Sequence, residues 1–302
     1  MKATGNPAPI SSPWTRRQVL GAAAAGALFS ALPARILGAD KPKRIPIGVQ
    51  LYSLRGECEK DLDPVLKQVA KMGFEGVEFY GNSYFKYAGK AKELRKRLDD
   101  LHLKSEGIHT NTAALRGDGL KSSIEVSKIL GTRFLIVPGD GDMTDPERSK
   151  SLAETFNKAA EALKPLGIAC GFHNHTGEFK KDGEKTYWDL FAERTTKDVV
   201  LQQDVGHTVA AGVDPVALIR KFPGRTLTTH FAPHAGDEKS GKKAIIGQDS
   251  VDWKGCITAC REAGGTEWFI VEQESYPDGK SPAECTQMSL VGLKKILAQM
   301  PK

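Results

Sequence analysis

Two hydrophobic patterns alternate along most of this chain. Short apolar runs of strand length recur eight times, and each is followed by a stretch able to form an amphipathic helix. Strand alternating with helix predicts a parallel sheet, and eight repeats predict a closed (β/α)8 barrel rather than an open sheet. The predicted strands span residues 45–53, 76–81, 104–110, 133–139, 168–175, 199–207, 227–234 and 268–274.

Glycines mark the passage from helix to strand. Gly73, Gly131 and Gly167 each precede a predicted strand, in the position where glycine commonly ends a helix. One long irregular segment, 234–249, follows the seventh strand, and we expect it to form a lid over the substrate. The predicted helices span residues 61–72, 89–102, 120–130, 147–165, 187–195, 214–221, 250–263 and 282–299.

The beginning of the chain does not follow the barrel pattern. A Thr-Arg-Arg-Gln-Val-Leu run at 15–20 is a twin-arginine pattern, and the Ala/Gly/Leu-rich segment 19–32 is shorter than the roughly 20 residues of a membrane-spanning helix. A basic start and a short apolar segment are typical of an export signal. We therefore predict a twin-arginine-type signal peptide over 1–39, a barrel domain over 40–302, export to the periplasm, and no stable membrane span after signal cleavage.

Charge and cysteine content narrow the class of protein. The 302-residue chain has a formal charge of +6, but without the four basic residues of 1–39 the remaining 263 residues carry only +2. This balance lacks the basic excess that nucleic-acid contact requires, so we expect no nucleic-acid partner. The five cysteines are odd in number and show no CxxC spacing, which indicates neither a zinc knuckle nor a disulfide framework.

Candidate chemistry gathers at the carboxyl ends of the predicted strands, where barrels of this kind build their active sites. The fifth strand ends in His173-Asn174-His175, and because strand side chains alternate, His173 and His175 point to the same side. A lone histidine is more often structural. Two imidazoles on one face of a barrel mouth instead suit a divalent metal.

The later strands add further ligand candidates. Asp204 ends the sixth strand and could cap a helix, but Asp214 caps the next predicted helix better, which leaves Asp204 for a metal. His230 ends the seventh strand. Glu272 and Glu274 share a face at the end of the eighth strand, so one suits a metal ligand and the other its partner.

Other strand ends carry residues suited to substrate hydroxyls. No G-x-G-x-x-G or G-x-x-x-x-G-K-[ST] phosphate loop occurs in the sequence, so we expect an unphosphorylated small molecule, namely a sugar, a keto-sugar or a cyclitol. The predicted substrate-binding residues are Tyr52, Glu78, His109, His234 and Glu274.

With these residues the chain resembles the sugar phosphate isomerase/epimerase family, the xylose isomerase-like TIM barrels. The resemblance implies one divalent ion, with no distinction among Mn, Zn, Fe, Co and Mg, held by His173, Asp204, His230 and Glu272. It covers residues 45–299 and is strongest at 47–53, 73–79, 171–179, 204–207, 214–215, 251–254 and 269–274.

The same resemblance implies a reaction. A divalent-metal-dependent isomerase or epimerase of this family removes a proton next to a metal-bound carbonyl and passes through an enediolate. Glu272 or Glu178 would take the proton from carbon, and His207 or His175 would handle the hydroxyl protons.

The fifth strand departs from the family pattern. Ketose epimerases of the family have Glu-Asn-His where this chain has His173-Asn174-His175, so one of two carboxylate bases is missing. A reaction with one principal base becomes at least as plausible as epimerisation, and the chain also resembles the inosose dehydratase branch. A dehydratase or lyase of a keto-sugar or cyclitol therefore stays open.

Two other protein classes share this barrel. Endonucleases that act at abasic DNA sites need additional histidines after the fourth and seventh strands, and neither 133–139 nor 235–249 contains one. That class is excluded. A non-catalytic exported sugar-binding barrel would have lost the metal ligands, and metal content would separate it from an enzyme. The sequence leaves a homo-oligomer open.

Overall fold

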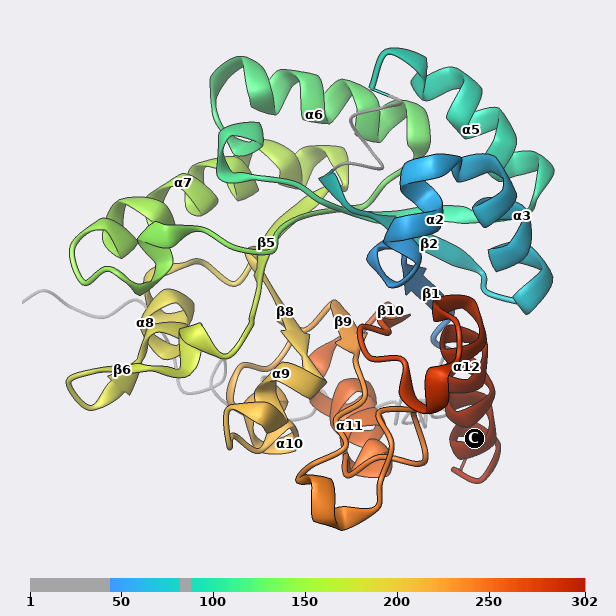
Figure 1. The fold of residues 1–302 in the computed structure, drawn as a ribbon. Helices are drawn as coiled ribbons and strands as arrows, with labels where there is room; N and C mark the ends of the chain where they lie inside the picture. The colour runs from blue at the N-terminus through green and yellow to red at the C-terminus, as the bar shows by residue number, and fades with distance from the viewer. Residues whose placement is uncertain (1–43, 82–87, 302) are drawn as a thin grey trace, which may run out of the picture. The chain divides into compact units, whose positions relative to one another are not determined.

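The structure is a computed structural model that describes residues 44–81 and 88–301. Within these residues, eight parallel strands close into one barrel in the order β1-β10-β9-β8-β5-β4-β3-β2, which confirms the predicted (β/α)8 fold (Figure 1). The predicted signal peptide, 1–39, lies outside the described residues. The barrel strands are β1 (Ile47–Gln50), β2 (Gly76–Phe79), β3 (Lys104–His109), β4 (Phe134–Val137), β5 (Ala169–His173), β8 (Val200–Asp204), β9 (Thr228–Phe231) and β10 (Trp268–Val271).

Helices surround the barrel and connect successive strands (Figure 1). No helix within the described part of the chain is both long enough and apolar enough to cross a membrane. The helices are α2 (Arg55–Lys60), α3 (Leu62–Met72), α5 (Ala91–Asp100), α6 (Gly117–Leu130), α7 (Arg148–Leu163), α8 (Tyr187–Arg194), α9 (Val205–Ala210), α10 (Pro215–Lys221), α11 (Trp253–Ala259), followed by a π-helical turn (Cys260–Gly264), and α12 (Pro282–Ala298).

The helix ends follow from local sequence signals. The Asp61 side chain accepts a hydrogen bond from the backbone N–H of Asp63 at the start of α3, and Gly73 ends that helix with φ of 90°. Ser281 and Glu284 form a capping box at the start of α12. These signals set both ends of α3 and the start of α12.

Apolar side chains fill the amino-terminal half of the barrel. A Cβ on Gly76 would lie 2.9 Å from the ring of Trp268, so glycine at this position leaves space for the indole. Trp268 packs there with Phe134, Ile136 and Val200. These side chains form an apolar cluster between β4, β8 and β10.

Two helices and a hairpin of the structure were not predicted from the sequence. Helix α2 follows β1 through a 3-10 turn, η1 (Leu51–Leu54), and helix α9 begins directly after β8. A two-stranded antiparallel pair, β6 (Lys181–Asp182) with β7 (Lys185–Thr186), precedes α8. These elements are short, and their residues had been included in strands or loops.

The long segment after β9 does not form the predicted lid. Ile245 and Ile246 are buried, and the backbone N–H of Ile246 donates to Ser289 Oγ of α12 at 3.2 Å. The side-chain amide of Gln273 donates to the carbonyl oxygen of Ala244 at 2.7 Å. These contacts anchor the last part of the segment beside α12.

Candidate active site

Four predicted metal ligands meet at the carboxyl end of the barrel. His173 ends β5, Asp204 ends β8, His230 lies in β9 and Glu272 follows β10, and these four strands are consecutive neighbours in the barrel. All four side chains are buried, and one ligand atom from each lies within 4.8 Å of the others. We refer to these four residues as the ligand cluster. Two imidazoles and two carboxylates are a donor set that suits a divalent transition metal.

Asp204 both caps a helix and leaves an oxygen open. Its Oδ1 accepts a hydrogen bond of 2.6 Å from the backbone N–H of His207 at the start of α9, so the expectation that Asp204 caps no helix is wrong. Its Oδ2 is buried and has no hydrogen-bond partner among residues 44–81 and 88–301. Burial raises the pKa of Asp204 to about 7. An unpartnered buried carboxylate oxygen is costly unless a cation satisfies it, so this atom fits a metal.

His173 is held in one tautomer by a neighbouring glutamine. The side-chain carbonyl of Gln202 lies 3.0 Å from His173 Nδ1, which assigns the ring proton to Nδ1 and leaves Nε2 as a lone pair. Burial, together with the nearby imidazoles of His230 and His109, lowers the pKa of His173 well below its usual range. The ring is therefore neutral near pH 7, as a metal ligand requires.

His230 lies between two carboxylates. Its Nδ1 is 2.7 Å from Glu272 Oε2, and its Nε2 is hydrogen-bonded to Glu78 Oε2. Burial alone would lower the pKa of His230, but the charges of Glu272 and Glu78 raise it well above the usual value. Without a metal the imidazole is thus protonated, and a metal at Nδ1 would replace that proton.

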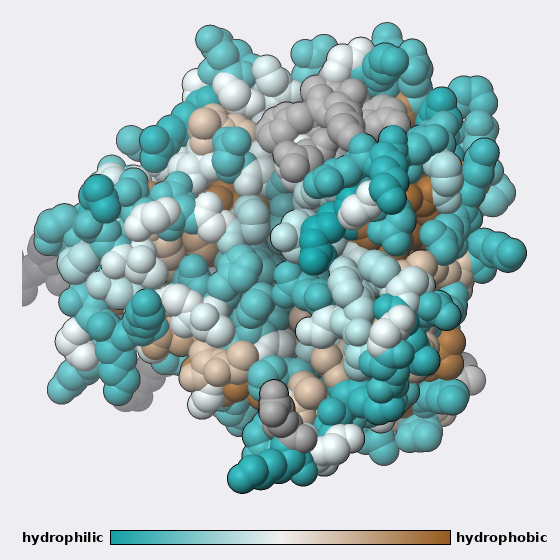
Figure 2. Space-filling view, in the orientation of Figure 1, coloured by the Kyte–Doolittle hydropathy of each residue, from teal (hydrophilic) through white to brown (hydrophobic). Residues whose placement is uncertain are grey.

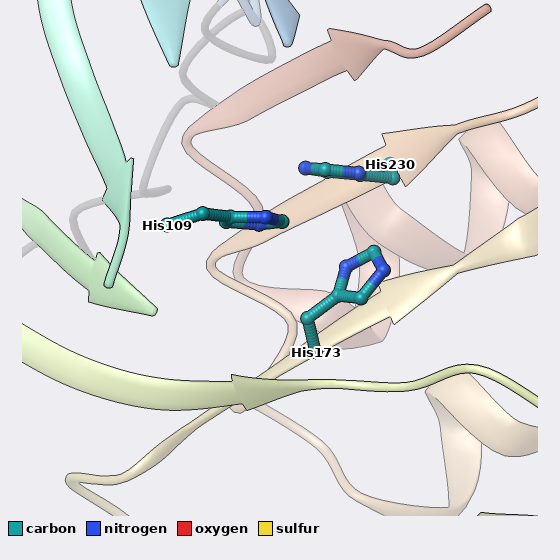
Figure 3. Close-up of side chains that lie close together, drawn as sticks. All are labelled: His109, His173 and His230. Atoms are coloured by element: carbon teal, nitrogen blue, oxygen red, sulfur yellow. The ribbon is translucent and has the colours of Figure 1, made fainter. Parts of the chain in front are cut away.

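His109 completes a group of three histidines (Figure 3). Its ring stacks on that of His230, with centroids 4.9 Å apart and planes 7° from parallel. The ring of His173 is inclined to both. His109 Nε2 lies 2.8 Å from the same Gln202 oxygen that fixes His173. His109 also lines a cavity of about 800 Å³ beside the ligand cluster.

Glu78 lies beneath the cluster rather than at the substrate surface. It has no exposed surface, and its oxygens accept hydrogen bonds of 2.9 Å from Gln50 and from Gln202 in addition to the bond from His230. Burial would raise the pKa of Glu78, but His109 and His230 together lower it to about 2. The predicted contact with substrate hydroxyls does not fit this position, because Glu78 is fully buried and is absent from the lining of the two cavities beside the cluster.

Gln202 was missed as a site residue. It is fully buried and joins His109, His173 and Glu78 through one amide group. Its place was available from the sequence, because Gln202 precedes Asp204 by two positions in one strand and therefore faces the same side. A buried amide with several partners gives a side-chain network that fixes the orientation of the ligands.

Two cavities adjoin the ligand cluster. The larger has a volume of about 800 Å³, and the smaller has about 140 Å³. Hydrophilic residues cover the middle of the face shown in Figure 2. The larger cavity is lined by Tyr52, Arg55, Tyr80, His109, His173, His175, Glu272 and Glu274, among others. The smaller is lined by Asp204, His207, His234, Glu272 and Glu274, among others.

His175 and His207 have opposite protonation. Their ring centroids lie 4.7 Å apart. Burial and the neighbouring His207 lower the pKa of His175. Burial would also lower the pKa of His207, but Glu274, 3.4 Å away, and Asp204 raise it to about 9. The pair therefore offers one neutral and one protonated imidazole near pH 7.

The other predicted residues are divided between the cavities and the loops. Glu178 is buried, and its Oε2 accepts a hydrogen bond of 2.8 Å from the backbone N–H of His175. It lines neither cavity, so its expected role as a base does not fit. Tyr52 lines the larger cavity and His234 the smaller.

Comparison with known proteins agrees with this architecture. The family model described as xylose isomerase-like TIM barrel matches residues 66–293. The chain therefore belongs to the xylose isomerase-like TIM barrel family, as its sequence motifs predict.

Relatives and solved structures of several activities are similar to this chain. An inosose dehydratase of Clostridium tetani is 27% identical over 264 residues, which cover 75% of this chain and 87% of that protein. A rhizopine catabolism protein of Rhizobium meliloti is 22% identical over 272 residues, 78% of this chain and 82% of the relative. A sugar phosphate isomerase/epimerase structure from Parabacteroides distasonis has a TM-score of 0.69 at 22% identity, covering 86% of this chain and 96% of that chain. An L-ribulose 3-epimerase structure has a TM-score of 0.59 at 16% identity, covering 85% and 97%.

Proposed function

We propose that this chain is a divalent-metal-dependent isomerase or epimerase of a sugar or keto-sugar. The observation that carries the proposal is the buried ligand cluster beside a cavity of about 800 Å³, with Asp204 Oδ2 unpartnered among the described residues. Inosose dehydratases act on an inosose and L-ribulose 3-epimerase on L-ribulose, and both compounds are polyhydroxy ketones. That chemistry gives the proposed substrate class.

Residues of this chain supply the proton transfers. A bound divalent ion would polarise the substrate carbonyl and make the neighbouring C–H bond more acidic. Glu272 lines both cavities, which supports its carboxylate as the base that takes the proton from carbon. His175 lines the larger cavity as a neutral imidazole and can accept a hydroxyl proton. His207 is protonated and can return a proton.

Elimination of water is the second candidate reaction. Glu272 and the protonated His207 line the same small cavity. Such a pair places a base and an acid together: the base takes a proton from carbon, the neighbouring C–O bond breaks, and the acid protonates the departing hydroxyl, which leaves as water. The relatives named inosose dehydratase favour this reaction as the alternative.

Metal analysis tests the proposal first. We expect about one divalent ion per chain in protein purified without chelator, and its loss in His173→Ala and in Glu272→Ala. His102→Ala, at a histidine on the connection between α5 and β3, is the matched control and should keep the ion. A wild-type protein that neither retains nor rebinds a divalent ion would favour a non-catalytic sugar-binding barrel instead.

Product analysis separates the two reactions. The metal-loaded protein is incubated with a panel of keto-sugars and inososes in deuterated water and the products are measured by mass spectrometry. A gain of one mass unit from deuterium at carbon, with no loss of water, indicates isomerisation or epimerisation. Loss of one water indicates elimination. No change in any compound with the metal bound would contradict both reactions for this substrate class.

Export is a separate part of the proposal. The twin-arginine run at 15–20 supports a signal peptide over 1–39 and a periplasmic location for the barrel, with no nucleic-acid partner. A fusion of residues 1–39 to a folded reporter should be exported, and replacement of Arg16 and Arg17 by Lys should stop export. A reporter that stays inside the cell with the native signal would contradict it. Mass measurement of the native protein tests whether the barrel assembles into a homo-oligomer.

A further inference from the structure

Aromatic side chains line the larger cavity together with His173 and Glu272 of the ligand cluster. Tyr52 lies in η1 directly after β1, Arg55 begins α2, and Tyr80 follows β2. All three line the cavity that His173 and Glu272 also line. The elements after β1 and β2 thus give the cavity a wall of different chemistry from the histidines and carboxylates of the ligand cluster.

This wall is held in a fixed arrangement. The Arg55 guanidinium lies over the Tyr52 ring, 4.4 Å from its centroid, and Arg55 Nη1 donates to the Tyr52 carbonyl oxygen at 3.0 Å and to the Tyr276 hydroxyl at 3.1 Å. The Tyr276 hydroxyl in turn donates to the carbonyl oxygen of Ser53 at 3.1 Å. The rings of Tyr52 and Tyr80 are nearly perpendicular, with centroids 5.5 Å apart. Such contacts fix the ring of Tyr52 before any ligand binds.

Tyr52 nevertheless keeps much of its surface accessible. Its exposed fraction is 38%, the largest of any tyrosine among the described residues, whereas Tyr80 is only 8% exposed. An exposed aromatic ring that is held rigidly in a cavity is suited to stacking against a flat or ring-shaped ligand, because no side-chain freedom is lost on binding.

The volume of the cavity also supports the binding of a ring beside Tyr52. Clefts of about 300–1,000 Å³ are typical for drug-sized ligands, and this one has about 800 Å³. A single sugar ring bound at the ligand cluster is much smaller than such a ligand. Space therefore remains on the side of Tyr52 for a second group.

We propose that Tyr52, supported by Arg55 and Tyr80, forms a subsite for a second ring attached to the reacting sugar. The substrate class is then a glycoside or disaccharide rather than a free monosaccharide: one ring reacts at the ligand cluster and the other stacks on Tyr52. This inference rests on the proposed function for the identity of the reacting ring, and the stacking itself can be measured without any reaction.

Binding of matched glycosides tests the subsite. Isothermal titration of the full metal-loaded chain compares phenyl with methyl glycosides of glucose, galactose and xylose, with unreactive sugars so that no turnover occurs. Aromatic stacking contributes enough for the phenyl compound of the bound sugar to bind about fivefold to tenfold more tightly than the methyl compound. We expect Tyr52→Ala to abolish this preference, and Tyr52→Phe and Tyr52→Trp to retain it.

A control variant and a metal-site variant make the outcomes distinct. Tyr187→Ala, at a partly buried tyrosine that begins α8 and lies outside the cavity lining, should keep the preference. His173→Ala should lose the ion and still prefer the phenyl compound. Retention of the ion in His173→Ala would count against the proposed function alone. An equal preference in wild type and Tyr52→Ala, or no preference for phenyl over methyl in wild type for any of the three sugars, would overturn the subsite.

Discussion

The carboxylate of Glu78 accepts a hydrogen bond from Nε2 of His230, and neither side chain has any exposed surface. The same imidazole turns Nδ1 toward Glu272 in the ligand cluster. A carboxylate on one ring nitrogen and a metal on the other is the arrangement that orients histidine ligands and increases their basicity. Glu78 would therefore act on a bound metal through His230, without being a ligand itself.

Replacement of Glu78 should weaken metal binding without removing a ligand. Glu78→Gln keeps the shape of the side chain but loses the charge that orients and polarises His230. We expect metal affinity to fall about 10-fold to 100-fold, measured by competition with a chelator of known affinity. Glu75→Gln is the control, because Glu75 directly precedes β2 but forms an ion pair with Arg44 on the surface. Equal affinities in wild type and Glu78→Gln would contradict the role of Glu78.

Metal binding should release protons, and more of them at lower pH. His230 is protonated in the metal-free protein because Glu272 and Glu78 raise its pKa, and Asp204 has a pKa of about 7. Near pH 6 a metal must displace a proton from both groups, whereas near pH 8 Asp204 is already ionised. We expect release to fall from about two protons to about one across this range, with affinity rising with pH.

Calorimetry in buffers of different ionisation enthalpy measures this release. The apparent binding enthalpy should vary with the buffer, and the slope gives the number of protons released. His230→Gln should remove one proton from the count at both pH values. A slope of zero in wild type would show that the ligands are already deprotonated.

The alternation of strands with helices was enough to predict the fold, and the carboxyl ends of the strands were enough to predict where the ligand cluster lies. His173, Asp204, His230 and Glu272 all come from strand ends, and parallel strands bring their carboxyl ends to one rim. The role of Asp204 was predicted only in part. A carboxylate has two oxygens, and the sequence pattern assigned the residue a single role. The structure gives Oδ1 to the helix and leaves Oδ2 open.

Residues that act through hydrogen bonds were less accessible from the sequence. Glu78 lies near the end of β2 and was predicted to bind substrate, and only its depth in the barrel shows that it faces His230 instead. Glu178 is acidic and close in sequence to His175, yet it bonds the loop backbone. Residue type and spacing do not encode depth or the direction of a side chain in a loop, so these roles required the structure.

Glu106 should make the protein less stable as pH rises. Its side chain is buried, and neither carboxyl oxygen has a hydrogen-bond partner among the described residues. Burial and the nearby Glu78 raise its pKa well above the usual value. The folded protein therefore keeps a proton that the unfolded chain releases above about pH 4.3, and stability falls by up to about 1.4 kcal/mol per pH unit until the folded pKa is reached.

Glu106→Gln should remove this dependence. The variant should be more stable than wild type at pH 7, and the difference should shrink toward pH 4, as measured by urea unfolding of the metal-free proteins. Glu125→Gln, at an exposed position in α6, should run parallel to wild type. Parallel curves for wild type and Glu106→Gln would show that Glu106 has the same pKa in the folded and unfolded states.

Two adjacent glutamines of β8 should differ in their effect on metal binding. Gln202 accepts hydrogen bonds from His109 and His173, whereas Gln203 points to the helix layer and donates to the Pro215 carbonyl oxygen at 3.3 Å. Both are buried, so Leu at either position should cost about 1–3 kcal/mol of unfolding free energy. Only Gln202→Leu should also weaken metal affinity, by about 10-fold or more, because the tautomer of His173 is no longer fixed. An equal loss of affinity in both variants would mean that the effect comes from stability alone.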